Sequence, residues 1–311
     1  MDERLLVKVS QWYYLQGLTQ ETIAQKVGIS RSTISRLLTQ AKKRGIVKFN
    51  VSSVVRGYDV DLERRLEEVF GLQEAAVYDG SVAESPVFLA RTGADILVRS
   101  LAEGAVIGLS WGRSVAAVVD HVPIVDPPVK NLTVVALSGG IGSSQPEIMS
   151  NSLVAKLASK LKASAALFNA PVVVQNRFTR DILMKESSIA PVIEIASHAD
   201  VALVGIGAVG QFSTLSTLSH LESSSFKELM QRGAVGDICS RFYTIKGQPV
   251  SSELDSRTLG IPLLALKTIP RVIAVAWGIE KKQAILGALH MGIIEVLVTD
   301  RYTAEAILDS V

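Results

Sequence analysis

Residues 19–45 contain two short helical patterns joined by a glycine turn, and this arrangement constrains the fold more than any other feature of the chain. Thr19 is placed to cap the first helix, which ends at Gly28, because a threonine hydroxyl can accept a hydrogen bond from a free N–H of the first turn. Ser30 is placed to cap the second helix, which ends at Gly45. An amphipathic stretch before them predicts a further helix. This order predicts a helix-turn-helix.

The second helix of this pair has a polar face opposite its apolar side chains. The residues of that face in the first two turns are Arg31, Ser32, Thr33, Ser35 and Arg36. A recognition helix reaches base edges of the major groove with these turns, where arginine can bind guanine through two hydrogen bonds. Lys42 and Lys43 follow later and suit contacts to phosphates. The alternative is a three-helix bundle with a solvated polar face, but caps, turn and charge together favour DNA binding.

The charge of the chain is unevenly distributed. Residues 1–50 contain nine lysines and arginines against three acidic residues, a balance of +6, whereas the other residues have a balance of −4. A basic head on a mildly acidic body indicates a polyanionic partner for the head alone. We therefore expect residues 1–52 to be a domain that binds double-stranded DNA.

Two elements are predicted between this head and the body. The alternation of Ile46–Val51 predicts a strand that would form a wing beside the helix-turn-helix. Apolar positions from Tyr58 to Phe70 predict an amphipathic helix, which we interpret as a linker helix within residues 53–71. A dimerisation contact is the alternative for this helix, and the sequence does not separate the two.

The body, residues 72–311, alternates strand-like apolar runs with amphipathic stretches. The predicted strands are Glu74–Tyr78, Val106–Leu109, Leu132–Leu137, Ala165–Phe168, Val201–Gly205, Val272–Ala276 and Glu295–Val298. Continuous runs of valine, isoleucine and leucine are typical of strands buried on both faces, and their alternation with helices indicates parallel βα units. The sequence therefore predicts an α/β fold with a doubly wound parallel sheet.

Small, flexible residues follow three of these strands, at the carboxyl ends where such sheets bind ligands. The candidate ligand-binding residues of these loops are Gly112, Arg113, Ser114, Ser138, Gly139, Gly140, Gly205 and Gly207. Glycines let backbone N–H groups approach an anion, and a following helix adds its positive end. Several such loops on one sheet edge predict a phosphorylated small molecule as ligand.

Three charged residues near strand ends extend this candidate site. Asp237 could accept hydrogen bonds from sugar hydroxyls, while Arg257 and Lys281 could pair with phosphate; a surface salt bridge or a cap is the alternative for each. The run Gly205–Gly210 also has the GxGxxG spacing of dinucleotide-binding proteins. It lies well into the sheet and precedes a poor helix former, so we expect no nicotinamide or other cofactor.

Composition disfavours several classes of protein. The single cysteine, Cys239, leaves no intramolecular disulfide, and the four histidines show no metal-binding spacing, so no metal site is expected. No apolar run reaches the length of a membrane span, and the N-terminus lacks a signal-peptide pattern. We expect a soluble, cytoplasmic protein without a membrane partner.

Long sequence blocks resemble the SorC family of bacterial sugar-responsive regulators over nearly the full length. They are LTQETIAQKVGISRSTISRLLTQAKKRGIV in the head and, in the body, GLSWGRSV, LSGGIGSS, AVGDICSRFY, SRTLGI, AVAWGIEKKQAILGAL and LVTDRYTAEAIL. The resemblance implies an effector domain related to ribose-5-phosphate isomerase and glucosamine-6-phosphate deaminase, which also serves oligomerisation. It further implies a homotetramer, a dimer of dimers, that controls a sugar-catabolic operon in response to a phosphorylated sugar.

The resemblance also implies roles for individual residues. Ser138, Gly139 and Gly140 would bind the effector phosphate, Asp237 would contact the sugar, and Lys281 would be a basic contact. A family member that binds deoxyribose phosphate has a lysine before the Gly-Gly pair, which forms a Schiff base with the sugar. Ser138 cannot form an imine. The expected effector is therefore a phosphorylated sugar or polyol that binds without a covalent bond.

These observations predict a DNA-binding transcriptional regulator of a sugar or polyol operon, and not an enzyme. The alternative is a sugar-phosphate isomerase or deaminase with an appended DNA-binding head. Such an enzyme needs a positioned acid and base, and Asp237 and Lys281 could supply only part of that set.

Overall fold

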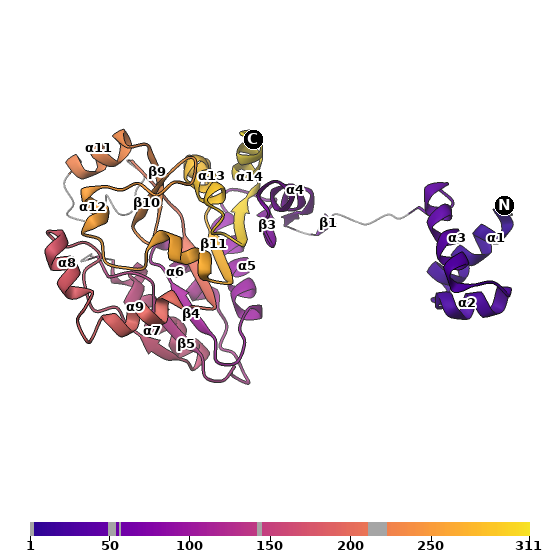
Figure 1. The fold of residues 1–311 in the computed structure, drawn as a ribbon, viewed down its shortest axis with the longest axis horizontal. Coiled ribbons are helices and arrows are strands. Elements are labelled where there is room, and N and C mark those ends of the chain that lie inside the picture. Colours follow the sequence, from indigo (N-terminus) through magenta and orange to yellow (C-terminus); the bar gives the residue numbers. More distant parts are fainter. Residues whose placement is uncertain (1–2, 49–53, 56, 142–144, 211–222) are drawn as a thin grey trace. The chain divides into compact units, whose positions relative to one another are not determined.

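The computed structural model describes residues 3–48, 54–55, 57–141, 145–210 and 223–311 (Figure 1). The chain forms two compact units, Met1–Ser52 and Ser53–Val311, and each is described by itself. Within the described residues, no helix is long and apolar enough to cross a membrane.

The first unit is built from three helical segments around a small core. Helix α1 (Glu3–Ser10) continues into a π-helical turn (Gln11–Leu15), and α2 (Gln20–Val27) and α3 (Arg31–Lys43) follow. The hydroxyls of Thr19 and Ser30 accept hydrogen bonds from the N–H groups of Thr22 and Thr33 at 3.1 and 3.2 Å, so both predicted caps are confirmed. The buried core residues are Leu6, Val9, Ile23, Ala24, Ile34, Leu37, Leu38 and Ala41. The predicted helix-turn-helix is therefore present.

The strand predicted over Ile46–Val51 is not formed by residues 46–48, while residues 49–51 lie outside the described residues. The N–H groups of Ile46 and Val47 both donate to the carbonyl of Ala41, at 2.9 and 3.2 Å. Both side chains also pack on the core of the first unit. An alternating strand would turn one of them to solvent. Ile46 and Val47 therefore pack at the C-terminal end of α3 and do not begin the strand of a wing.

The second unit contains a sheet of nine described strands in the order β1-β2-β3-β12-β11-β7-β4-β5-β6. Their bounds are β1 (Val54–Val55), β2 (Tyr58–Asp59), β3 (Glu74–Tyr78), β4 (Val106–Leu109), β5 (Thr133–Ala136), β6 (Ser164–Ala166), β7 (Val201–Gly205), β11 (Arg271–Val275) and β12 (Val296–Asp300). The strands from β3 to β6 in this order are parallel. The predicted parallel α/β sheet is confirmed, with an antiparallel pair, β1 and β2, added at one edge.

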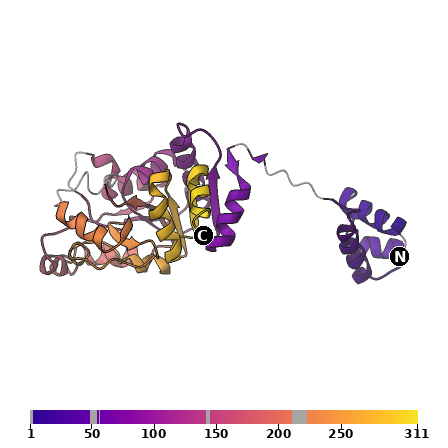
Figure 2. The same cartoon turned by 90° about the horizontal axis from the view of Figure 1, so that it is seen from above.

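Helices cover both faces of this sheet (Figures 1 and 2). The described helices of the second unit are α4 (Val60–Phe70), α5 (Ser85–Arg99), α6 (Arg113–His121), α7 (Ser150–Leu161), α8 (Arg177–Leu183), α9 (Ala190–Ser197), α11 (Ser223–Gln231), α12 (Glu253–Ser256), α13 (Lys282–Met291) and α14 (Arg301–Leu308), of which α11 packs on β9 (Ala234–Ile238). Side chains alternate between the faces, as period-2 geometry requires. In β3, Ala76 and Tyr78 join the core that contains α5, α6 and α7, whereas Ala75 and Val77 join the core that contains α4, α13 and α14.

The helix predicted as a linker, α4, belongs to the second unit and attaches to the outer edge of β3. Carboxylates of Glu63 and Glu67 accept hydrogen bonds from the N–H groups of Val77 and Ala75, both at 2.9 Å. Two glutamates one helical turn apart thus match alternate N–H groups of the strand. These carboxylates therefore supply acceptors for the N–H groups at this edge of the sheet, where no further described strand pairs with β3.

A second, three-stranded sheet stands beside the carboxyl end of β7. It contains β8 (Gly207–Ala208), β9 (Ala234–Ile238) and β10 (Arg241–Thr244), paired antiparallel in the order β10-β9-β8. Only Ile206 separates β7 from β8. The sequence did not predict these strands, yet they position several residues of the candidate site.

Candidate functional site

A cavity of about 220 Å³ lies at the carboxyl ends of β4, β7 and β11, and we call it the strand-end cavity. Its lining residues are Trp111, Gly112, Arg113, Ser114, Gly205, Ile206, Gly207, Ala208, Asp237, Cys239, Glu280 and Lys281. The predicted residues among them are Gly112, Arg113, Ser114, Gly205, Gly207, Asp237 and Lys281. This edge is where doubly wound sheets bind ligands.

The loop after β4 brings the start of α6 to the cavity. Gly112 caps α6 with φ 121°, a conformation that favours glycine. Its N–H donates to the carbonyl of Ile148 at 2.9 Å, and the hydroxyl of Ser110 accepts the N–H of Gly205 at 3.1 Å. The second bond holds the ends of β4 and β7 next to each other, and the first ties the loop to the turn Pro146–Ile148. The first turn of α6, with its positive dipole end and Arg113, therefore lines the cavity.

Gly207 is required by the close approach of Asp237. The two residues are partners in the β8–β9 pairing, and a Cβ at position 207 would lie 2.1 Å from Oδ1 of Asp237. At Gly205, a Cβ would lie 3.6 Å from its nearest neighbour, which is ordinary contact. Glycine at 207 makes room for a carboxylate that is only 6% exposed.

The carboxylate of Asp237 and the amine of Lys281 both lie in a poorly hydrated environment. Burial raises the pKa of Asp237 to about 6, although the N–H of Ser240, 3.2 Å from Oδ2, and the charge of Lys281 both lower it. Burial also lowers the pKa of Lys281, while Glu280 and Asp237 raise it. A ligand that donates hydrogen bonds to Asp237 would favour its ionised form. The cavity therefore suits a ligand with hydroxyl groups.

The turn between β9 and β10 is held in an unusual conformation. Its central residues, Cys239 and Ser240, have φ values of 53° and 62°, the left-handed region that non-glycine residues rarely adopt. The Oγ of Ser240 accepts a hydrogen bond from Nε1 of Trp111 at 3.2 Å, which ties the turn to the loop after β4. Burial raises the pKa of the Cys239 thiol to about 12, which disfavours the thiolate, the nucleophilic form.

Sequence reasoning missed several lining residues. Trp111, Cys239 and Glu280 line the cavity but were not predicted to contact a ligand. Trp111 and Glu280 directly precede the predicted residues Gly112 and Lys281, so their position in the loops was the available signal. Ile206 and Ala208 lie within the run Gly205–Gly210, which has the spacing of a dinucleotide motif, and they carried no signal of their own.

Four predicted residues do not line the strand-end cavity: Ser138, Gly139, Gly140 and Arg257. The N–H of Gly139 donates to the carbonyl of Leu259 at 3.2 Å, and that of Gly140 donates to Ala170 at 3.0 Å. Nη1 of Arg257 donates to the carbonyl of Val174 at 3.2 Å. These three donors thus already have backbone partners, whereas Oγ of Ser138 and Nε of Arg257 are buried without a hydrogen-bond partner among the described residues. The rest of this loop, Gly142–Ser144, lies outside the described residues.

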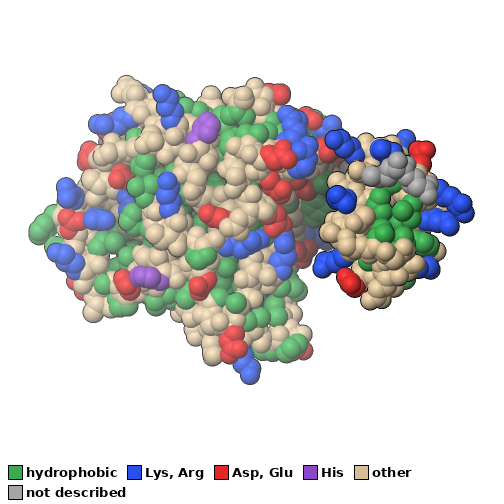
Figure 3. Space-filling view, turned by 45° about the vertical axis from the view of Figure 1, so that its right-hand side comes forward, with side chains coloured by type: hydrophobic (Ala, Val, Ile, Leu, Met, Phe, Trp, Pro, Cys, Tyr) green, Lys and Arg blue, Asp and Glu red, His purple; other side chains and the backbone are tan. Residues whose placement is uncertain are grey.

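The predicted DNA-contacting residues lie on the side of α3 opposite its buried residues. Arg31, Ser32, Ser35, Arg36, Lys42 and Lys43 are exposed. Thr33 is half-buried, and its Oγ1 lies 2.8 Å from Oγ of the capping Ser30. Lysine and arginine side chains stand out on the surface of the first unit (Figure 3). The face thus presents cations and hydroxyls together, and the hydroxyls of Ser32 and Thr33 both lie within hydrogen-bonding distance of the capping Ser30.

Comparison with known proteins gives matches to both units. Residues 57–309 match the family described as "Putative sugar-binding domain", and residues 7–44 match "Sigma-70, region 4". The chain is 36% identical to the sorbitol operon regulator of Klebsiella pneumoniae and 32% identical to the deoxyribonucleoside regulator of Bacillus subtilis. Each alignment covers 99% of this chain and 98% of the relative.

Solved structures show the same architecture. The crystal structure of the full-length sorbitol operon regulator SorC from Klebsiella pneumoniae matches with a TM-score of 0.78 at 36% identity, covering 98% of each chain. A DeoR family regulator from Listeria monocytogenes matches with a TM-score of 0.74 at 35% identity, covering 80% of this chain and 98% of that one. The helix-turn-helix, the parallel sheet and these full-length matches agree: the chain belongs to the SorC family of sugar-binding transcriptional regulators.

Proposed function

We propose that the chain regulates a sugar or polyol operon, and that its effector is a phosphorylated sugar or polyol bound in the strand-end cavity. The observation that carries this proposal is a buried carboxylate, Asp237, in one cavity with Arg113, Lys281 and the start of α6. A carboxylate accepts hydrogen bonds from sugar hydroxyls, and two cations with a helix N-terminus bind phosphate. Relatives named for sorbitol and deoxyribonucleoside regulation support a sugar-derived effector.

The effector binds without a covalent bond in this proposal. Ser138 cannot form an imine, and it is buried away from the residues that line the cavity. Lys281 is the amine to test, because burial lowers its pKa as imine formation requires. We expect no mass increase after incubation with deoxyribose 5-phosphate and borohydride. An adduct that disappears in Lys281→Arg would contradict non-covalent binding.

The chain acts as a regulator and not as an enzyme in this proposal. Cys239 is unsuited to nucleophilic attack, and Asp237 and Lys281 form an incomplete acid–base set. NMR of sugar phosphates mixed with the protein should show no conversion. Turnover at ordinary enzyme rates would contradict the proposal and favour an isomerase or deaminase.

Effector binding controls the operator through the assembly. We infer a homotetramer from the family resemblance, in which the effector shifts the population between arrangements of different DNA affinity. Sedimentation velocity of the full chain checks the tetramer directly. A monomer at micromolar concentration would contradict this part of the proposal.

The decisive experiment measures operator binding of the full chain by fluorescence anisotropy, using DNA from upstream of its own gene. A panel of sugar and polyol phosphates is compared with the unphosphorylated counterparts. We expect one phosphorylated compound to change affinity by at least about fivefold and its counterpart to have no effect. Lys281→Gln should abolish the response, whereas Arg232→Gln, which alters an exposed pair on α11 with Glu228, should retain it. A normal response in Lys281→Gln, or none from the whole panel, would overturn the proposal.

A further inference from the structure

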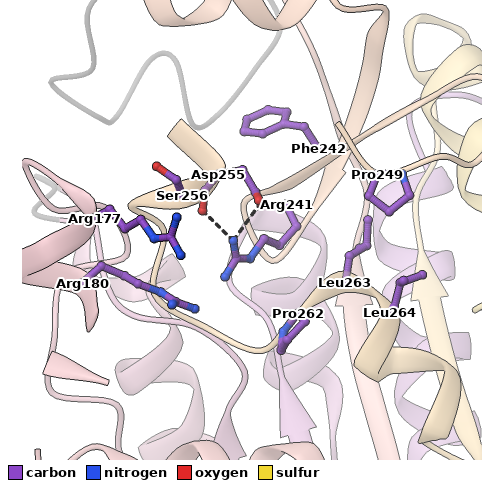
Figure 4. A pocket seen from close by; sticks show the side chains of 10 residues that line it. All are labelled: Arg177, Arg180, Arg241, Phe242, Pro249, Asp255, Ser256, Pro262, Leu263 and Leu264. Carbon is purple, nitrogen blue, oxygen red and sulfur yellow. Dashed lines mark hydrogen bonds and ion pairs between the residues drawn. The ribbon is translucent and has the colours of Figure 1, made fainter. Parts of the chain in front are cut away.

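A second cavity, of about 360 Å³, lies among α8, α12 and β10, and we call it the arginine cavity. Its lining residues are Arg177, Arg180, Arg241, Phe242, Pro249, Asp255, Ser256, Pro262, Leu263 and Leu264. It shares no lining residue with the strand-end cavity. Figure 4 shows the guanidinium groups of Arg177, Arg180 and Arg241 pointing into the same space. Three cations thus converge on one cavity.

Arg241 is the fixed member of this group, since its side chain is only 7% exposed. Its Nη1 donates to the carbonyl and to Oδ1 of Asp255, at 2.9 and 2.8 Å. Its Nη2 donates to the carbonyls of Thr258 and Gly260, at 3.1 and 3.4 Å. Its Nε is buried and has no hydrogen-bond partner among the described residues. The guanidinium is thus held rigidly.

Arg177 and Arg180 share one carboxylate and retain unused donors. Nη1 of Arg180 lies 2.8 Å from Oδ1 of Asp181, and Nε of Arg177 lies 3.5 Å from its Oδ2. The hydrogen bond from Arg180 lowers the pKa of Asp181, so this carboxylate is ionised. Three guanidiniums therefore face two carboxylates, Asp181 and Asp255. One positive charge remains in excess.

The unused donors belong to the two arginines of α8. In the described part of the chain, the terminal nitrogens of Arg177 and Nη2 of Arg180 have no protein acceptor, and Nε of Arg180 is buried without one. Guanidinium donors match phosphoryl oxygens in pairs, which is why arginine is favoured at phosphate sites. The donors that remain are thus of the kind that binds a phosphoryl group.

The remaining wall of the arginine cavity is apolar. Pro249, Pro262, Leu263 and Leu264 lie on the side away from α8 (Figure 4), and Leu264 is 52% exposed. A cationic end and an apolar wall within one cavity suit a phosphoryl group attached to a small carbon body. We propose that the arginine cavity binds a small organic phosphate, as a second ligand site apart from the strand-end cavity.

Isothermal titration calorimetry of the full chain tests this site, with glycerol 3-phosphate, inorganic phosphate and glycerol as probes. The titrations are made in Lys281→Gln, so that the strand-end cavity contributes little. We expect both phosphates to bind and glycerol not to bind; tighter binding of glycerol 3-phosphate would show that the apolar wall contributes. Adding Arg177→Gln and Arg180→Gln should weaken phosphate binding at least about tenfold. Adding Arg232→Gln, which removes an exposed arginine just after the end of α11 that pairs with Glu228, should leave it unchanged.

Three results would overturn the proposal. The first is equal phosphate affinity with and without the two arginine substitutions. The second is loss of all phosphate binding in Lys281→Gln alone, which would place the anion in the strand-end cavity. The third is a change of oligomeric state in the arginine variants at unchanged phosphate affinity, which would make the cavity a contact between chains. If the double substitution prevents folding, the single variant Arg177→Gln replaces it in the titrations. The Arg177 side chain is 77% exposed, so its replacement should not disturb folding.

Discussion

An alanine at position 207 would place a methyl group in the space that Asp237 occupies. Its Cβ would lie 2.1 Å from Oδ1 and 3.1 Å from Cγ of Asp237. Non-bonded heavy atoms in contact lie about 3.5 Å apart, so the carboxylate must move by roughly 1 Å or more. Asp237 is buried beside Ser240, whose N–H it accepts at 3.2 Å, so this movement also breaks a hydrogen bond.

The expected cost follows from these two losses. Overpacking a buried site costs about 1–3 kcal/mol, and a lost hydrogen bond costs about 1 kcal/mol. We expect Gly207→Ala to lower the free energy of unfolding of the second unit by about 2–4 kcal/mol. The matched control is Gly205→Ala, whose Cβ would lie 3.6 Å from its nearest neighbour. That change should stay within about 0.5 kcal/mol of the original chain.

Urea unfolding followed by the fluorescence of Trp111 and Trp277, both in the second unit, measures these values. A double-mutant cycle with Asp237→Ala isolates the clash, because that variant removes the atoms that the new methyl group would meet. Gly207→Ala should then cost little in the Asp237→Ala background. A cost that is the same in both backgrounds, or an equal cost for Gly205→Ala, would refute the reasoning.

Three further predictions concern the caps, the DNA and pH. Ser30→Ala removes the acceptor for the N–H of Thr33 and should destabilise the first unit by about 1 kcal/mol; an unchanged thermal midpoint of that unit would contradict it. Arg36→Ala should weaken operator binding by about 1–3 kcal/mol if Arg36 contacts a base, and an equal loss on random DNA would make it a phosphate contact instead. The pKa of Asp237 is about 6 when folded and returns to its ordinary value of 3.8 on unfolding, so the folded state holds the proton more tightly. The resulting stabilisation is present in full below the unfolded pKa and is lost as pH rises through about 6, by at most about 3 kcal/mol. Unfolding of Asp237→Asn, which cannot ionise, should show a smaller decrease between pH 4 and 7, and an identical decrease would contradict this assignment.

The sequence by itself determined the elements that depend on neighbouring residues. Thr19 and Ser30 cap their helices, and the predicted bounds of Glu74–Tyr78, Val106–Leu109 and Val201–Gly205 agree with those of β3, β4 and β7. A cap is a bond between residues three apart, and a strand buried on both faces needs only a continuous apolar run. Such features depend on residues close together in the sequence, so they can be predicted without knowledge of the fold.

Only the tertiary structure decided which polar residues meet in the strand-end cavity. Strand β9 contains Gly236 and Asp237, which have low strand propensity, but a Cβ at 236 would lie 2.6 Å from Oη of Tyr243, so packing selects glycine there. The loop Ser138–Gly140 and the loop at Gly112 look alike in sequence. In one, the N–H groups of Gly139 and Gly140 donate to backbone carbonyls; in the other, the start of α6 lines the cavity. A glycine loop shows the same pattern whether it lines a cavity or packs against another chain segment, because the residues that surround it are distant in sequence.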